Sequence, residues 1–178
     1  NYAYQELEVE KRNPFSKMII VGEGGDAVKR GTFTTEQLID GYQQAFASNS
    51  NVQLLFPILG ETGCRLAEIV GLRLEDIDLD RRLLNIRPND KRRLKTTGSE
   101  RSLPLTETAY LALTKALEYS NEEWLYLRYI KEDGRYATHA SNALAKWTKR
   151  RWRMTAHSLR HTFRERLRAA EVPLEAID

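Results

Sequence analysis

The chain has one cysteine, no long apolar run and little net charge, and each absence excludes a class of protein. Cys64 is alone among 178 residues, so no internal disulfide and no Cys-x-x-Cys metal site can form. The longest uncharged stretch, Gly41 to Gly60, is too rich in glutamine, asparagine and serine to span a bilayer. With 41% hydrophobic and 30% charged residues, the chain can bury one sizeable core. We therefore expect one folded domain without a membrane segment, in a reducing compartment such as the cytoplasm.

The net charge of +3 conceals an uneven distribution along the chain. Residues 81–101 carry a net +6 and residues 146–168 a net +8, so the other 134 residues carry −11. If both basic segments lie on one side of the fold, they form a surface that attracts a polyanion such as nucleic acid. Solvated charge on an ordinary protein surface is the alternative.

Helical periodicity dominates the chain from residue 32 onward. Thr34 and Gln37 form a capping-box pattern at a helix start. Helices are expected over residues 34–46, 52–63, 65–71, 106–117 and 140–147 and from residue 157. Extended segments are expected over residues 83–87, 101–105 and 124–130, the first two as strands of a hairpin. The predicted fold class is therefore mainly α with a small antiparallel β-sheet, an α+β fold.

The first 31 residues differ in character from the rest. They are irregular, with Pro14 and a glycine cluster, which is typical of a linker. Because the chain begins with Asn1 and not with Met, we interpret it as a piece of a longer protein. The expected division is a linker over residues 1–31 and a folded domain over residues 32–178.

The helix expected from residue 157 has two contrasting faces. One face is apolar, with Leu159, Phe163, Leu167 and Ala170. The stripe beside it is basic or titratable, with His157, Arg160, His161, Arg164 and Arg168. This stripe suits an anion, although a solvated surface helix has the same pattern. His157 and His161 have a zinc-like i, i+4 spacing, but Ser158 stands where that motif has Glu and Arg160 would repel a cation, so we expect no metal.

The segment Glu61 to Leu72 combines a glycine, an arginine and an acidic residue one turn later. Arg65 follows Gly63 closely and can direct its planar guanidinium away from a helix, in a geometry that suits phosphate oxygens. Glu68 lies at i+3 from Arg65 and can hold it. An ordinary surface ion pair is the alternative. Cys64 is expected to be a small buried residue and not a nucleophile.

Three segments in a fixed order connect these features. TGCRLAEIVGLRLEDID, KTTGSERSLPL and HSLRHTF follow one another as in the catalytic domain of tyrosine recombinases, the phage-integrase family, which the chain resembles. The resemblance covers Phe33 to Asp178 and implies that family's fold, with residues 1–31 as the linker from a separate core-binding domain. Carried over position by position, it implies a catalytic set of Arg65, Glu68, Lys95, His157 and Arg160.

The resemblance implies DNA strand breakage and rejoining without a metal or a cofactor. In this family a tyrosine hydroxyl attacks a DNA phosphodiester, forms a 3′-phosphotyrosyl link and releases a 5′-hydroxyl. Arg65 and Arg160 would hold the nonbridging phosphate oxygens, and Lys95 would protonate the leaving oxygen. His157 would take the tyrosine proton or bond the phosphate, and both roles stay open. Glu68 would support these groups from behind.

The family's nucleophilic tyrosine, and a further His or Trp before it, follow the HxxR helix. All eight tyrosines of this chain precede His157, the last being Tyr136. We therefore expect the chain as given to bind DNA as a monomer without cleaving it, unless a partner chain supplies the tyrosine. The longer protein is expected to act as a homotetramer on double-stranded attachment sites in a prokaryotic cytoplasm, at the nucleoid, integrating a prophage or another mobile element.

Other functions fit parts of the pattern. A non-catalytic DNA-binding regulator with the same fold is the main alternative, followed by a type IB topoisomerase and a helical interaction module. Seven basic residues outside the catalytic set are expected to contact backbone phosphates: Arg92, Arg93, Arg101, Lys149, Arg150, Arg151 and Arg153. Loss of each true contact should lower the salt slope of DNA binding by roughly one.

Overall fold

The structure is a computed structural model, and it describes residues 31–92, 100–130 and 136–173. Two of the predicted site residues, Arg93 and Lys95, lie outside the described residues, as does the expected linker up to residue 30. Within the described ranges, no helix is both long enough and apolar enough to cross a bilayer.

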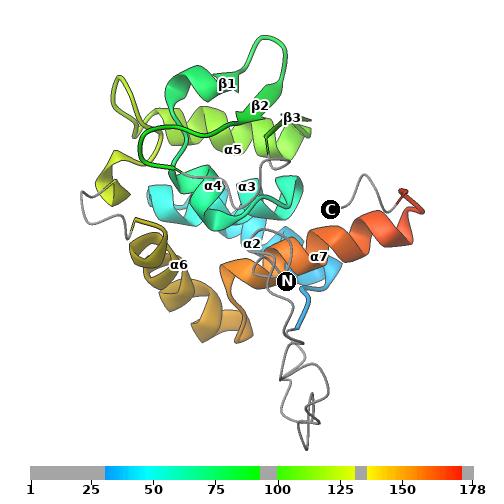
Figure 1. Cartoon of the computed structure of the whole chain (residues 1–178). Helices are drawn as coiled ribbons and strands as arrows, with labels where there is room; N and C mark the ends of the chain where they lie inside the picture. Colours follow the sequence, from blue (N-terminus) through cyan, green and yellow to red (C-terminus); the bar gives the residue numbers. More distant parts are fainter. Residues whose placement is uncertain (1–30, 93–99, 131–135, 174–178) are drawn as a thin grey trace, which may run out of the picture.

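Helices make up most of the fold, with a small sheet packed at one edge (Figure 1). The helices are α2 (Thr35–Ala47), α3 (Asn51–Thr62), α4 (Leu66–Val70), α5 (Glu107–Leu117), α6 (Tyr136–Trp152) and α7 (Ala156–Ala169). The strands are β1 (Ile77–Asp78), β2 (Leu83–Ile86) and β3 (Arg101–Pro104). Short 3₁₀ turns occupy Leu74–Asp76 and Leu127–Tyr129. The predicted fold class is confirmed.

Several helix ends follow directly from local sequence signals. The Thr34 side chain accepts a hydrogen bond from the Gln37 N–H, and the Gln37 side chain accepts one from the Thr34 N–H, which completes the expected capping box of α2. At the start of α5, the Thr106 side chain accepts a hydrogen bond from the Ala109 N–H. Gly63 ends α3 in the left-handed conformation, with φ of 62°.

The core is built around α3, which contacts α2, α5, α6 and α7. Its fully buried side chains are Leu54, Leu55, Phe56, Ile58 and Leu59. This helix has apolar residues on almost all sides because it is covered on almost all sides. Phe56 also joins a group of aromatic rings at the base of α6, with edge contacts to Phe33 and Trp147 at centroid distances of 5.1 and 5.3 Å. The central position of α3 fixes the place of its C-terminal end, from which the candidate site starts.

The sheet has the order β1-β2-β3, with both pairs antiparallel. The two hairpin strands were expected, and the short strand β1 was not. Ile86 pairs with Arg101, and since cross-strand partners project to the same face, Arg101 shares the inward face of the buried Ile86. The register of the hairpin therefore turns a charged side chain toward the interior of the domain.

The expectation of an extended segment over residues 124–130 is largely wrong. Trp124 forms one isolated bridge with Arg73, and the chain then turns. The Tyr129 and Ile130 N–H groups donate to carbonyls three residues earlier, both at 2.9 Å. Beyond that bridge the backbone satisfies these donors by coiling on itself and not through a neighbouring strand.

The apolar stripe expected on the last helix is correct only in part. Leu159 is fully buried, but Ala170 is exposed and follows the end of α7. The inward face includes Thr162, whose hydroxyl accepts the Phe33 N–H and donates to the Ser158 carbonyl, both at 2.8 Å. Hydrogen bonding of this kind lets a polar side chain occupy a buried position.

Candidate active site

A sharp junction between α3 and α4 presents Arg65. Gly63 adopts a left-handed conformation, and a Cβ there would lie 2.2 Å from Cδ1 of Phe163 on α7. Glycine is therefore required for both the turn and the close approach of α7. Arg65 then takes an extended backbone conformation as the N-cap of α4, so that its side chain lies at the start of the helix and not along it.

Glu68 accepts hydrogen bonds from two arginines. Its Oε1 lies 2.9 Å from Nη1 of Arg65, and its Oε2 accepts the Arg65 backbone N–H at 2.8 Å. The same Oε2 lies 2.9 Å from Nη2 of Arg101 on β3. Glu68 is only 3% exposed, so the alternative of an ordinary surface ion pair does not describe it. Burial raises the pKa of Glu68, but hydrogen bonds from Arg101 and Arg65 outweigh it and hold the pKa below its usual value.

Arg160 reaches this junction from α7. Its guanidinium donates to the Gly63 carbonyl, and burial together with the nearby positive charge of Arg65 lowers its pKa. A guanidinium held beside another one implies a site that favours an anion. Among the described residues, Arg65 and Arg101 therefore pair with the carboxylate of Glu68 and Arg160 lies near enough to feel its charge, so the cluster carries excess positive charge.

His157 is exposed and lies one turn before Arg160 on the same helix. Its ring meets the ring of His161 edge to face, with centroids 4.5 Å apart. In the part of the chain that the structure describes, no group of three or more His, Cys, Asp or Glu residues could hold a metal ion.

The position of Arg92 does not support the prediction that it contacts DNA phosphates. Its side chain is 1% exposed and fully occupied by protein acceptors. Nη1 donates to the Glu68 carbonyl at 2.7 Å, Nη2 lies 3.3 Å from Oδ2 of the buried Asp76, and Nε donates to the Arg87 carbonyl at 3.0 Å. A positive charge in a basic run does not reveal by itself that a buried carboxylate lies opposite, and nothing in the local sequence signals this pairing.

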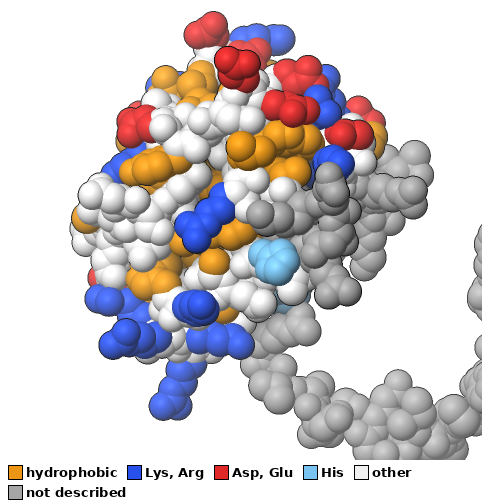
Figure 2. Space-filling view, turned by 90° about the vertical axis from the view of Figure 1, so that its left-hand side faces the viewer, with side chains coloured by type: hydrophobic (Ala, Val, Ile, Leu, Met, Phe, Trp, Pro, Cys, Tyr) orange, Lys and Arg blue, Asp and Glu red, His pale blue; other side chains and the backbone are white. Residues whose placement is uncertain are grey.

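The remaining predicted phosphate ligands lie at the end of α6. Lys149, Arg150 and Arg151 form its last turn, and Arg153 follows it with φ of 57°. All four are exposed. Arg151 lies 3.5 Å from Asp40, and its guanidinium stacks on the Trp152 ring at 5.9 Å. Figure 2 shows Lys and Arg gathered at the lower end of this face, where α6 ends, and Asp and Glu gathered at the opposite end, with some Lys and Arg among them.

Cys64 is the small buried residue that was expected. It is 1% exposed, and burial raises the pKa of its thiol to about 11, so the thiol stays protonated at neutral pH. Two of the tyrosines also have structural positions. Tyr42 donates to Oε1 of Glu61 at 2.8 Å, and Tyr126 is 1% exposed. Burial raises the pKa of both phenols.

Comparison with known sequences gives a consistent result. The model of the Phage integrase family matches residues 33–178. The transposase from transposon Tn916 of Enterococcus faecalis is 28% identical over 181 residues, covering 86% of this chain and 45% of that protein. The transposase from transposon Tn1545 of Streptococcus pneumoniae matches with the same identity and coverage. The chain therefore spans slightly less than half the length of these relatives.

Solved structures share the fold. The Tn1549 transposon integrase in complex with a circular intermediate DNA superposes with a TM-score of 0.70 at 19% identity, over 94% of this chain and 62% of that one. The XerA recombinase superposes with a TM-score of 0.64 at 19% identity, over 98% and 60%. At these identities the likeness establishes the architecture.

Proposed function

The chain belongs to the phage integrase family, and on that premise we propose that it carries the phosphate-binding centre of a tyrosine recombinase that breaks and rejoins DNA for a mobile element. The observation that carries this proposal is the meeting of Arg65 and Arg160 at the Gly63 junction. Arg65 precedes α4 and Arg160 lies on α7, yet Arg160 donates to the carbonyl of Gly63, two residues before Arg65. Its relatives include transposases from two transposons, which supports the proposal that the reaction serves a mobile element.

Two guanidiniums at one point can stabilise the transition state of phosphoryl transfer without a metal ion. Negative charge builds on the nonbridging oxygens as the phosphorus becomes five-coordinate, and preorganised arginines neutralise it without reorganising. Arg65 is held by Glu68 at 2.9 Å, so part of its ordering cost is met before DNA binds. We assign Arg65 and Arg160 to the two nonbridging oxygens.

Proton transfers complete the proposed reaction. The attacking tyrosine loses a proton, and the leaving 5′ oxygen gains one. His157 is exposed beside Arg160, where it can take the first proton or bond the phosphate. Lys95 is proposed as the donor to the leaving oxygen. The phosphotyrosyl link then conserves the energy of the phosphodiester, so that a second 5′-hydroxyl can reseal the strand.

DNA binding is proposed to extend from this centre to the end of α6. The four exposed cations there, Lys149, Arg150, Arg151 and Arg153, suit backbone phosphates, which position a duplex without reading its sequence. Full-length homotetramers on attachment sites in the cytoplasm, at the nucleoid, are part of the same proposal. The 178-residue chain by itself is proposed to bind DNA as a monomer.

A covalent-trapping experiment tests the reaction. The natural protein that contains these residues is incubated with a nicked suicide substrate in EDTA, alongside its Arg160→Ala variant. We expect a protein–DNA adduct from the wild type and a loss of roughly a hundredfold or more in its rate of formation in the variant. Binding of DNA without any adduct would move the assignment to a non-catalytic regulator. An adduct that forms equally well in both proteins would remove Arg160 from the site.

A further inference from the structure

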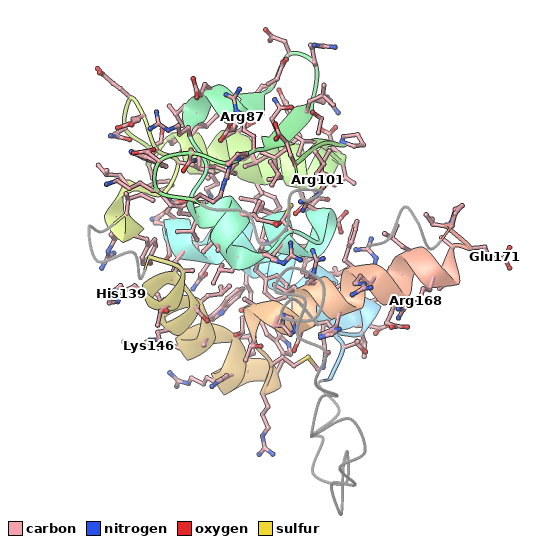
Figure 3. The ribbon with its side chains drawn as sticks, in the orientation of Figure 1. Arg87, Arg101, His139, Lys146, Arg168 and Glu171 are labelled. Carbon is pink, nitrogen blue, oxygen red and sulfur yellow. The ribbon has the colours of Figure 1, made fainter. Side chains whose placement is uncertain are left out.

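Arg101 is expected from the sequence to contact DNA, yet in the structure it contacts the protein. It lies on β3 between the sheet and the helices beneath it (Figure 3). Its Nη2 lies 2.9 Å from Oε2 of Glu68 and 3.5 Å from the sulfur of Cys64. Its side chain is 28% exposed, whereas that of Glu68 is 4% exposed. The Arg101 guanidinium is therefore directed toward the interior of the domain, where it and Arg65 bind the same buried carboxylate, that of Glu68.

Glu68 divides its two oxygens between two arginines. Oε1 faces Arg65, and Oε2 faces both Arg101 and the Arg65 backbone. A carboxylate that holds Arg65 in one orientation must itself be held in one rotamer. Arg101 on β3 holds this rotamer of the Glu68 side chain. Arg92 donates to the backbone carbonyl of Glu68 at 2.7 Å. The side chain and the main chain of Glu68 are thus each fixed by a different arginine.

We propose that Arg101 is a positioning residue for the phosphoryl-transfer reaction: it fixes Glu68, and through Glu68 it orients Arg65 toward the phosphate. This inference rests on the proposed function. It assigns to Arg101 an action through the protein in place of a direct contact with the DNA backbone. Positioning of this kind matters because small displacements of a group that binds the transition state cost large factors in rate.

The charges around Glu68 give the proposal a second signature. Among the described residues, the charged and titratable groups that act on Glu68 are Arg65 at the N-cap of α4, Arg101 on β3, Arg160 on α7 and the Cys64 thiol. Burial favours the neutral acid, and the hydrogen bond from Arg101 is the largest of the opposing effects. When this bond is removed, the pKa of Glu68 rises. Acid then neutralises the carboxylate, and loosens Arg65, at a higher pH than in the wild type.

The salt dependence of DNA binding separates the two roles of Arg101. We compare the wild type with Arg101→Gln and measure affinity for a duplex over a range of salt concentrations. A true phosphate contact lowers the slope of log K against log salt by roughly one when it is lost. For a positioning residue we expect an unchanged slope. The matched control is Arg150→Gln, whose slope should fall by roughly one.

In the natural protein that contains these residues, the rate of adduct formation at saturating DNA measures positioning directly. We expect Arg101→Gln to lower this rate by roughly 10- to 100-fold and to move its decline in acid to higher pH. Arg101→Lys, which keeps a cation opposite Glu68, should recover part of the rate. In the double variant Arg101→Gln, Glu68→Gln, no carboxylate titrates at this position, so the shift of the rate decline to higher pH should disappear. The control variant Arg81→Gln removes an exposed arginine whose backbone N–H donates to Asp78 and which, among the described residues, bonds neither Glu68 nor Arg65. It should leave both the salt slope of DNA binding and the rate of adduct formation unchanged.

The outcomes distinguish this inference from the proposed function. A reduced slope with a normal rate at saturating DNA would overturn positioning and make Arg101 a phosphate ligand. If the natural protein that contains these residues forms no adduct, the proposed function fails, and ¹³C NMR titration of the Glu68 carboxyl in Arg101→Gln still tests the coupling. An unchanged Glu68 titration there would overturn the inference whatever the activity.

Discussion

The two basic segments, residues 81–101 and 146–168, carry similar net charges of +6 and +8 but place their arginines differently. Four described arginines of the first segment pair with carboxylates: Arg82 with Glu107, Arg87 with Glu75 and Asp76, Arg92 with Asp76, and Arg101 with Glu68. In the second segment, the cations at the end of α6 are exposed around a helix terminus. Among the described residues, the end of α6 therefore matches the basic surface that the charge count predicts, although Arg151, Arg166 and Arg168 of the second segment also pair with carboxylates.

This difference shows that a run of positive charge can build a site as well as line a surface. The arginines of the first segment tie the sheet and its flanking turns to α4 and the neighbouring helices, because carboxylates from other elements lie opposite them. Those at the end of α6 face solvent, where attraction for a polyanion depends on salt. Stability should thus respond to changes in the first segment, and DNA affinity to changes in the second.

Arg92→Met tests the structural role of the first basic segment and should have the largest effect. This change leaves the Asp76 carboxylate, 1% exposed, without one of its two arginine partners, and it removes the donor to the Glu68 carbonyl. We expect a loss of about 3–5 kcal/mol in the free energy of unfolding, measured by urea denaturation. Adding Asp76→Asn should restore part of the loss. A variant as stable as the wild type would contradict the structural role of Arg92.

Gly63→Ala tests the junction on which both segments converge. Alanine must adopt φ near 62°, and its Cβ would lie 2.2 Å from a Phe163 ring atom. We expect a loss of about 2–4 kcal/mol in the free energy of unfolding, from strain and overpacking together. Phe163→Leu in the same chain should relieve the overpacking and leave the backbone strain, so the two effects should not add. Simple additivity would show that α7 does not press on this turn.

Glu68→Gln tests whether the carboxylate that pairs with the first basic segment stabilises the fold in a pH-dependent way. The pKa of Glu68 in the folded chain lies below its usual value of 4.5, so the unfolded chain binds the proton more tightly. The stabilisation is therefore complete above pH 4.5 and is lost as the pH falls through the folded pKa. At pH 7 we expect Glu68→Gln to cost about 1–3 kcal/mol in urea denaturation. The difference between the two proteins should shrink below pH 4.5, and a constant difference would show that the carboxylate charge is not what matters.

The smallest effect on stability is expected from Arg150→Gln at the exposed end of α6. Its side chain faces solvent, so the free energy of unfolding should stay within the scatter of the measurement. The salt slope of DNA binding should nevertheless fall by roughly one. Fluorescence anisotropy with a labelled duplex measures this slope. Loss of stability with an unchanged slope would reverse the roles that we assign to the two segments.

Local signals predicted the elements of this fold well wherever the relevant partner lies nearby in the sequence. The capping box at Thr34 and the stop at Gly63 depend on residues within one turn, and both are present. The prediction of an extended segment over residues 124–130 was wrong beyond Trp124, and strand β1 was missed, because a strand exists only when another lies beside it. Lys95 remains a prediction, since it lies outside the described residues.

The sequence by itself determined the fold class, several helix ends and the family, because these depend on periodicity, capping and the order of motifs, whereas α6 extends beyond the expected residues 140–147 at both ends. The pairing of Arg160 with the Arg65 junction, and the assignment of Arg92 and Arg101 to carboxylates, were decided only by the tertiary structure. A charged side chain has the same sequence signature in water and in the interior. Its role depends on which opposite charge the packing of distant helices and strands brings within a few ångströms.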